Sequence, residues 1–217
     1  IDNDKLVVDN DKWWRCVMKN IITISGNLGS GKSTMGKILS ENLNLSVYAS
    51  GDVMRHLAQK KNMDINEFVE FLSSHKEYDA LIDNEVANIA KEKNNLLFVS
   101  RMAWYFIPQS FKVFLYVDES VGAERIINDK LRNAEKYLSY EEAFNAIKLR
   151  FEKSRKRFIE LYGVDICDPS NYDLYLDTTN MSIIDVKNVI LKSYYEYMMY
   201  GGEKRHGKAF INYKYKD

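Results

Sequence analysis

The sequence has little of what marks several other protein classes. It contains two cysteines, Cys16 and Cys167, which match neither a zinc-binding spacing nor a disulfide framework. It has no apolar run near the roughly 20 residues that a membrane helix needs, and its first residues are rich in Asp and Asn, unlike a signal peptide. We therefore expect a cytoplasmic protein with ordinary thiols and no membrane partner.

The sequence also lacks an excess of charge of either sign. Lys plus Arg and Asp plus Glu each total 31, so the formal net charge is zero. No global basic field favours nucleic acid, and we expect no stable nucleic-acid partner. The 217 residues fit one domain with a small insert or lid. We expect a monomer, although no pattern in the sequence reports on oligomeric state.

Short apolar runs alternate with helical patterns along the chain. The longest helical stretches are residues 52–93 and 119–162, and helix-start capping boxes begin at Asp64, Ser139 and Ser182. This alternation predicts an α/β fold, a three-layer α/β/α sandwich around a five-stranded parallel sheet. The expected strands are residues 21–25, 46–49, 96–99, 113–117 and 174–176.

The two ends of the chain differ from the centre. Residues 1–19 are polar and show no period, so we predict an N-terminal extension before a domain over residues 20–198. Because Met18 directly precedes the first predicted strand, residues 1–17 are either upstream, non-native sequence or a genuine arm. Residues 199–217 are basic, aromatic and aperiodic, which predicts a flexible tail.

A glycine-rich motif follows the first predicted strand and precedes a helix. It fits G-x-x-x-x-G-K-[ST] at each fixed position, in the context that supports a phosphate-binding loop. Its backbone N–H groups and the helix N-terminus would cradle the phosphates of ATP, Lys32 would reach the β- and γ-phosphates, and the Ser33 hydroxyl would bind Mg²⁺. The predicted ATP-binding residues are Gly26, Asn27, Leu28, Gly29, Ser30, Gly31, Lys32, Ser33 and Thr34.

The loop alone does not name the reaction, because GTPases, ATPases and small-molecule kinases share it. The absence of an acid closing a strand before a longer ATPase core favours a kinase, as do scattered arginines that could hold a second anionic substrate. Beyond the loop, the sequence from residue 21 to about residue 189 resembles the nucleoside monophosphate (NMP) kinases, most closely the archaeal-type cytidylate kinases. The resemblance is carried by ITISGNLGSGKST, ASGDVMRHLA, VSRMAW, AERI and YGVDICDPSNYDLYLDTT.

The resemblance implies further roles. It implies a helical NMP-binding insert at about 52–93, a lid at about 128–150, and ATP and Mg²⁺ as cofactors. Asp52 and Arg55 would open the insert and hold the acceptor nucleotide, and Arg101 would bind its phosphate. Arg125 would support the lid or stack on adenine. The alternatives are a helix N-cap for Asp52 and a surface position for Arg101.

One predicted helix carries two further arginines. Arg150 and Arg157 are seven residues apart, so they share a side of the helix about 10 Å apart along its axis, with Ser154 between them. From the resemblance we expect both arginines to act in catalysis by neutralising the transferring phosphoryl group, and Ser154 to contact substrate. The alternative is a solvated basic face, shared with neighbouring lysines such as Lys153 and Lys156.

The leading hypothesis is therefore phosphorylation of CMP or dCMP by direct in-line transfer. AMP, another nucleotide or a non-nucleotide metabolite is an alternative acceptor. A non-catalytic ATP-binding module is a third alternative, because Ser100 stands where relatives often have an acid and Asp129 where they tend to have a lid arginine.

Overall fold

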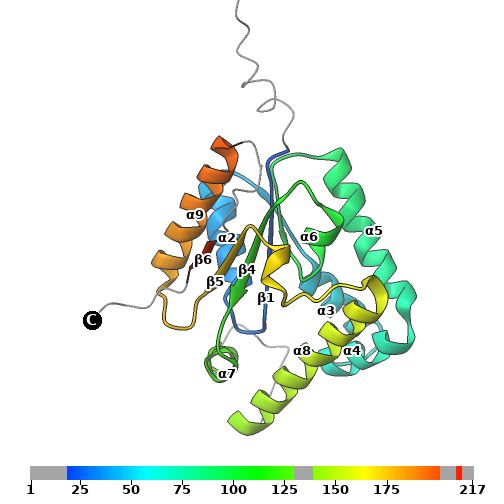
Figure 1. The fold of residues 1–217 in the computed structure, drawn as a ribbon. Helices are drawn as coiled ribbons and strands as arrows, with labels where there is room; N and C mark the ends of the chain where they lie inside the picture. The colour runs from blue at the N-terminus through cyan, green and yellow to red at the C-terminus, as the bar shows by residue number, and fades with distance from the viewer. Residues whose placement is uncertain (1–18, 130–138, 201–208, 212–217) are drawn as a thin grey trace, which may run out of the picture.

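The computed structural model describes residues 19–129, 139–200 and 209–211. A parallel sheet runs through the molecule in the order β2-β3-β1-β4-β5-β6 (Figure 1). Its strands are β1 (Ile21–Gly26), β2 (Ser46–Ala49), β3 (Leu96–Val99), β4 (Phe111–Tyr116), β5 (Leu174–Asp177) and β6 (Ala209–Ile211).

The helices alternate with the strands as expected. They are α2 (Lys32–Leu43), α3 (Ser50–Lys60), α4 (Ile65–Ser74), α5 (Lys76–Glu92), α6 (Ala103–Phe106), α7 (Glu119–Ile127), α8 (Tyr140–Tyr162) and α9 (Ile183–Met199), with a 3₁₀ turn at Pro169–Asn171. All three predicted helix starts are capped: Asp64 forms a full capping box with Glu67, while the hydroxyls of Ser139 and Ser182 accept from backbone N–H groups.

The α/β fold class is confirmed, with one correction to the strand count. The five predicted strands are β1 to β5, but a sixth strand, β6, pairs in parallel with β5 through Leu174 and Ala209. This strand lies inside the stretch predicted to be a flexible tail. It is only three residues long, which is too short to show a period in the sequence. Residues 1–18, 201–208 and 212–217 lie outside the described residues, so the proposed extension stays a prediction.

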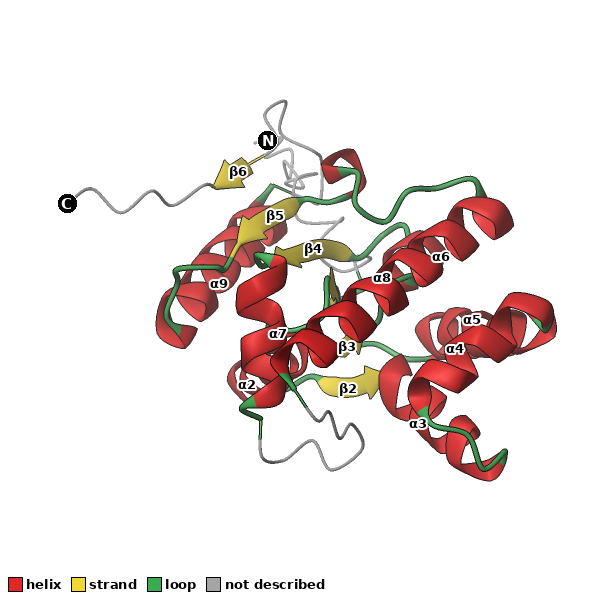
Figure 2. Ribbon diagram, turned by 90° about the horizontal axis from the view of Figure 1, so that it is seen from below, coloured by secondary structure: helices red, strands yellow, loops and turns green. Residues whose placement is uncertain are grey.

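The sheet is covered on both faces, which explains its continuous apolar strands. Helices α2 and α9 pack on one face, where Leu39 and Ile190 are fully buried against Ile24 and Leu115. Helices α5 and α6 cover the other face, and α8 crosses the lower end of the molecule beside α7 (Figures 1 and 2). Helices α3 to α5 form a small unit of their own around the buried Phe68 and Leu72 (Figure 2).

The strand register brings several loops to one edge of the sheet. Ile24 is level with Val99, and Val99 with Ala49. Because parallel strands end at the same edge, the loop after β1, the start of α3 and the loop after β3 meet there, where α/β proteins bind ligands. None of the described helices combines the length and apolarity that crossing a membrane requires.

Candidate functional site

The glycines of the loop after β1 allow approaches that a side chain would block. Gly26 has φ 146°, and a Cβ there would lie 2.1 Å from the Leu115 carbonyl oxygen. Gly29 has φ 78°, and its Cβ would lie 2.2 Å from the carbonyl oxygen of Gly122 on α7. Any other residue at either position would be strained by both its φ and the contact. The loop is thereby seated between β4 and α7.

Asn27 fixes the loop with its side chain, a role that the sequence motif does not signal. Its amide nitrogen donates to the Val117 carbonyl over 2.6 Å, and its amide oxygen accepts from the Val117 N–H over 3.0 Å. Asn27 is buried, so both bonds form out of water. The position is a variable one in the motif, and only the fold shows that it pairs with the end of β4.

The start of α2 has the features of an anion site. Its N-cap is Gly31 in the left-handed region, no side chain caps the helix, and its first turn has no acid. A Cβ on Gly31 would meet no atom within 4 Å, so the space above the helix N-terminus is open. The Lys32 ammonium donates to the Asn27 carbonyl over 2.5 Å, while Ser33 and Thr34 are exposed in the first turn. Backbone N–H groups, a dipole end and a cation therefore converge here.

The loop after β3 is tied to this phosphate-binding loop. Ser25, which directly precedes Gly26, donates from its hydroxyl to the Arg101 carbonyl over 3.1 Å, and the Trp104 indole donates to the same oxygen over 2.8 Å. The Arg101 guanidinium donates to the Ser154 hydroxyl on α8 over 2.8 Å. Arg101 is half-buried between loop and helix, and its binding of the acceptor phosphate stays a prediction.

Three predicted residues share the buried face of α8. Arg150, Ser154 and Arg157 are 5%, 0% and 4% exposed, which rules out the solvated basic face for the two arginines. Lys153 and Lys156 do lie on the outer side, in exposed pairs with Glu70 and Glu160. The Ser154 hydroxyl also donates to the Arg150 carbonyl over 2.9 Å.

Arg157 lies against an acid that the sequence motifs did not single out. Its Nε is 2.9 Å from Oδ2 of Asp79 on α5, in an ion pair whose atoms are not aligned for a hydrogen bond. One turn further along α5, Asp83 accepts a hydrogen bond from the hydroxyl of Tyr162 on α8. These four residues form what we call the α5–α8 polar cluster.

Burial shifts the acid–base behaviour of this cluster. Loss of water raises the pKa of Asp79, although the nearby Arg157 opposes the rise. Burial raises the pKa of Asp83 to about 6, with the Tyr162 hydrogen bond opposing this and the charge of Asp79 adding to it. Burial and then the hydrogen bond to Asp83 raise the pKa of Tyr162 as well.

Arg125 contacts the loop after β5. Its guanidinium donates to the carbonyls of Thr178 and Thr179 over 3.0 and 3.2 Å. The Thr178 hydroxyl in turn lies 3.5 Å from the Ser30 carbonyl and 2.8 Å from that of Tyr116. Arg125 thus supports a loop that lines the phosphate-binding loop, and contact with adenine stays a prediction.

Asp52 and Arg55 stand at the start of α3. They pair with each other, and their side chains are 71% and 40% exposed. Because the N-cap of α3 is Ala49, the N-cap alternative for Asp52 is wrong. Their contact with an acceptor stays a prediction.

The two departures from the family pattern have local structural roles. The buried Ser100 hydroxyl accepts from the Met102 N–H over 3.3 Å. Asp129 is exposed, and its backbone N–H donates to the Ile126 carbonyl at the end of α7. Residues 130–138, in the first half of the expected lid, lie outside the described residues.

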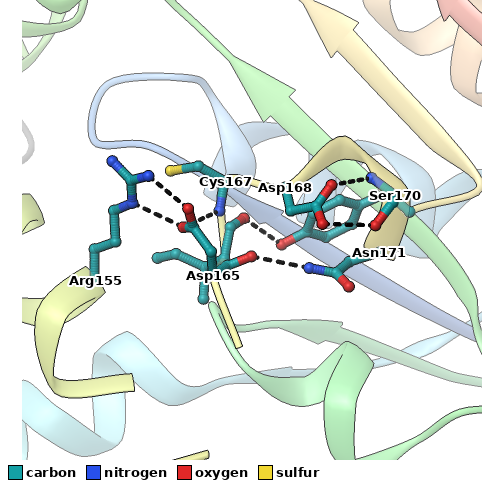
Figure 3. A network of polar contacts seen from close by, with 8 residues as sticks. Arg155, Asp165, Cys167, Asp168, Ser170 and Asn171 are labelled. Atoms are coloured by element: carbon teal, nitrogen blue, oxygen red, sulfur yellow. Dashed lines mark hydrogen bonds and ion pairs between the residues drawn. The ribbon is translucent and has the colours of Figure 1, made fainter. Parts of the chain in front are cut away.

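The segment between α8 and β5 is held by its own polar side chains (Figure 3). The Arg155 guanidinium binds both carboxylate oxygens of Asp165, with Nε to Oδ1 at 2.7 Å, and this pair holds the pKa of Asp165 below its usual range. Asp165 accepts from the Cys167 N–H, and Asn171 donates to its carbonyl. Burial raises the pKa of the Cys167 thiol. The segment therefore fixes the C-terminal half of α8, which carries Arg157.

Within the described part of the chain, no three His, Cys, Asp or Glu side chains gather in a way that could hold a metal ion. A Mg²⁺ ion would then rely on the Ser33 hydroxyl, nucleotide phosphates and water. Mg²⁺ commonly binds in this way, because it keeps several waters and takes its other ligands from substrate phosphates.

Comparisons with known proteins give a family match over most of the chain. The model of the cytidylate kinase-like family matches residues 21–180. A cytidylate kinase of Methanosphaera stadtmanae is 33% identical over 174 residues, covering 79% of this chain and 96% of that protein. An S-adenosylmethionine-dependent nucleotide dehydratase of Lacinutrix mariniflava is 35% identical over 178 residues, 82% of this chain, and the chain spans only 36% of its length.

Solved structures support the fold. A shikimate kinase from Acinetobacter baumannii superposes with a TM-score of 0.53 at 16% identity, over 90% of this chain and 99% of that one. A protein from Eubacterium ventriosum gives a TM-score of 0.58 at 20% identity, over 80% and 97%. At these identities the likeness speaks for the fold alone.

Proposed function

Because this chain belongs to the cytidylate kinase-like family and is a phosphotransferase, we propose that it moves the γ-phosphoryl group of ATP to a nucleoside monophosphate, with CMP or dCMP as the preferred acceptor. The observation that carries the proposal is the bond from the Ser25 hydroxyl to the Arg101 carbonyl. It holds an arginine suited to a phosphate directly beside the loop suited to ATP. A donor and an acceptor phosphate would therefore meet.

The loop fits the triphosphate of ATP. Its glycines bring backbone close to the ligand, and the uncapped N-terminus of α2 offers N–H groups. Ser33 supplies one oxygen for Mg²⁺, whose charge would offset that of the phosphates. Lys32 would leave the Asn27 carbonyl and follow the transferring group. This exchange trades a neutral acceptor for an anionic one, which makes a stronger hydrogen bond.

The acceptor would lie on the α8 side of the loop. Arg101 and Ser154 meet there, and Arg150 adds a buried cation two turns before Arg157. Placed around the phosphoryl group, these cations would neutralise the charge that develops during in-line transfer. Closure of the insert over them would exclude water, which would otherwise act as acceptor and make the enzyme an ATPase.

The test is ADP release, measured by a coupled assay across CMP, dCMP, UMP, AMP and GMP with a no-acceptor control. We expect the highest kcat/KM for CMP or dCMP and little release without acceptor. Lys32→Ala should remove most turnover in a folded protein, because the charge that follows the phosphoryl group is lost. ADP release that occurs only when AMP is the acceptor would reject the preference for a cytidine nucleotide. ATP binding without transfer to any monophosphate would reject the nucleoside monophosphate as acceptor and leave a kinase of another small acceptor or an ATP-binding module.

A further inference from the structure

The α5–α8 polar cluster lies outside the phosphate-binding loop, and both of its acids have a partner on the facing helix. Asp79 and Asp83 lie one turn apart on α5, and each is matched by a partner on α8, Arg157 and Tyr162. The side chains of Asp79 and Arg157 are 7% and 5% exposed. A charged pair is thus fully enclosed between a helix of the expected insert and the helix that carries Ser154.

Stability alone does not account for this pair. Removing two charges from water costs free energy that their attraction only partly returns, and apolar side chains of similar volume would hold two helices at least as well. A buried ion pair can instead serve to fix the orientation of one of its two side chains. Asp79 is placed to do this for Arg157.

The guanidinium of Arg157 contacts Asp79 through its Nε edge. Nε faces Asp79 in the ion pair, and neither Nε nor Nη1, both of them buried, makes a hydrogen bond with a described residue. A buried donor without an acceptor is unfavourable unless a ligand completes it. Ser154, the hydroxyl partner of Arg101, lies three residues and hence about 4.5 Å earlier along the same helix. Arg157 therefore shares the buried side of α8 with the hydroxyl that contacts Arg101.

We propose that Asp79 is a positioning residue: it holds the Nε edge of Arg157 so that Nη1 is presented to the acceptor nucleotide. This inference rests on the proposed function. Since Asp79 belongs to α5 and Arg157 to α8, the orientation of the arginine follows the position of α5. The Asp83–Tyr162 hydrogen bond, one turn further along α5, keeps the two helices in register. Placement of the insert and readiness of the acceptor site are thereby coupled.

A double-substitution cycle tests the positioning role. Asp79→Asn, Arg157→Met and the double variant are compared in acceptor kcat/KM and in KM for ATP. Asp79→Asn alone should lower acceptor kcat/KM by about 10- to 100-fold, the effect of a misplaced binding group, with KM for ATP unchanged. In the Arg157→Met background the same change should have less than about a twofold effect. Equal losses in both backgrounds, or a parallel rise in KM for ATP, would overturn the proposal.

Two further variants guard against a folding defect. Arg157→Lys keeps the charge opposite Asp79 but lacks the planar fork, so it should fold and still lose at least about tenfold in acceptor kcat/KM. Wild-type kinetics for Arg157→Lys would contradict the need for an oriented Nη1. Glu70→Gln is the matched control, because it breaks the exposed pair of Glu70 with Lys153, which also joins the insert to α8, and it should leave kinetics unchanged.

Melting temperatures of the same cycle separate this inference from the proposed function. Arg157→Met strands a buried carboxylate, so the double variant should melt at or above Arg157→Met. If the wild type phosphorylates no monophosphate, the proposed function and the acceptor role of Asp79 both fall, whatever the melting cycle shows. If the wild type is active and the melting temperatures are coupled while the kinetic effects are additive, only the positioning role is rejected.

Discussion

Removal of the Arg101 side chain should separate the two substrates. In Arg101→Ala the backbone carbonyl remains, so the bonds from Ser25 and Trp104 that shape the loop persist. What disappears is the guanidinium and its hydrogen bond to Ser154. The phosphate-binding loop should therefore keep its conformation while the acceptor phosphate loses a cationic partner.

The expected size follows from the contact that is lost. A hydrogen bond to a charged group contributes about 1.5–3 kcal/mol, which corresponds to a loss of about 10- to 150-fold in acceptor kcat/KM. The free energy of unfolding should fall by about 1.5–3 kcal/mol at most, the range for one hydrogen bond that involves a charged group. KM for ATP should stay the same, because the ATP cradle is built from the loop after β1 and the start of α2.

A two-substrate kinetic matrix with CMP and ATP measures both effects. Ser154→Ala is the matched variant, because it leaves the guanidinium but removes its hydroxyl partner. We expect an intermediate loss of about two- to tenfold, because the cation stays but is held less firmly in place. Equal weakening of ATP and CMP in Arg101→Ala, or no weakening of either, would refute the assignment of Arg101 to the acceptor phosphate.

Three other outcomes are expected. The folded-state pKa of Asp83 is raised to about 6. The protonated Asp83 side chain therefore stabilises the fold fully below about pH 4, and this contribution is lost as pH rises through 6. Relative to Asp83→Asn, wild type should lose about 1–3 kcal/mol of unfolding free energy between pH 4 and 7.5 in urea titrations, and parallel curves for the two proteins would contradict the pKa shift. Asn27→Ala should lower the free energy of unfolding by about 1–3 kcal/mol, since it strands the buried N–H and carbonyl of Val117; an unchanged urea midpoint would show that the loop does not need this anchor. A chain that begins at Met18 should keep its activity and lose less than about 0.5 kcal/mol of unfolding free energy, because the first strand begins at Ile21; a large drop in melting temperature would instead make the removed residues integral.

Sequence patterns predicted those features of the structure that depend on residues close together in the chain. The strand–loop–helix of the glycine-rich motif, the alternation of strands and helices and the three helix caps depend on residues within a few positions of one another. All three are found, although only Asp64 forms the full capping box that was predicted. The sharing of one side of α8 by Arg150 and Arg157 follows from helical geometry alone. Whether that side was buried did not, because periodicity cannot show which face a neighbouring helix covers.

The sequence by itself determined that this chain is a P-loop α/β protein, because the motif and its strand–helix context are contiguous. It also determined the kinase family, because the further segments that carry the resemblance, such as ASGDVMRHLA and VSRMAW, are each contiguous in the chain. Only the tertiary structure decided which distant groups meet. Ser25 meets Arg101, Asn27 meets Val117, and Asp79 meets Arg157 across 78 residues of chain. β6 joins the sheet in the same way, in a stretch without local pattern. Such pairings are fixed by packing and strand register between remote segments, and their free energy appears only once the chain has folded.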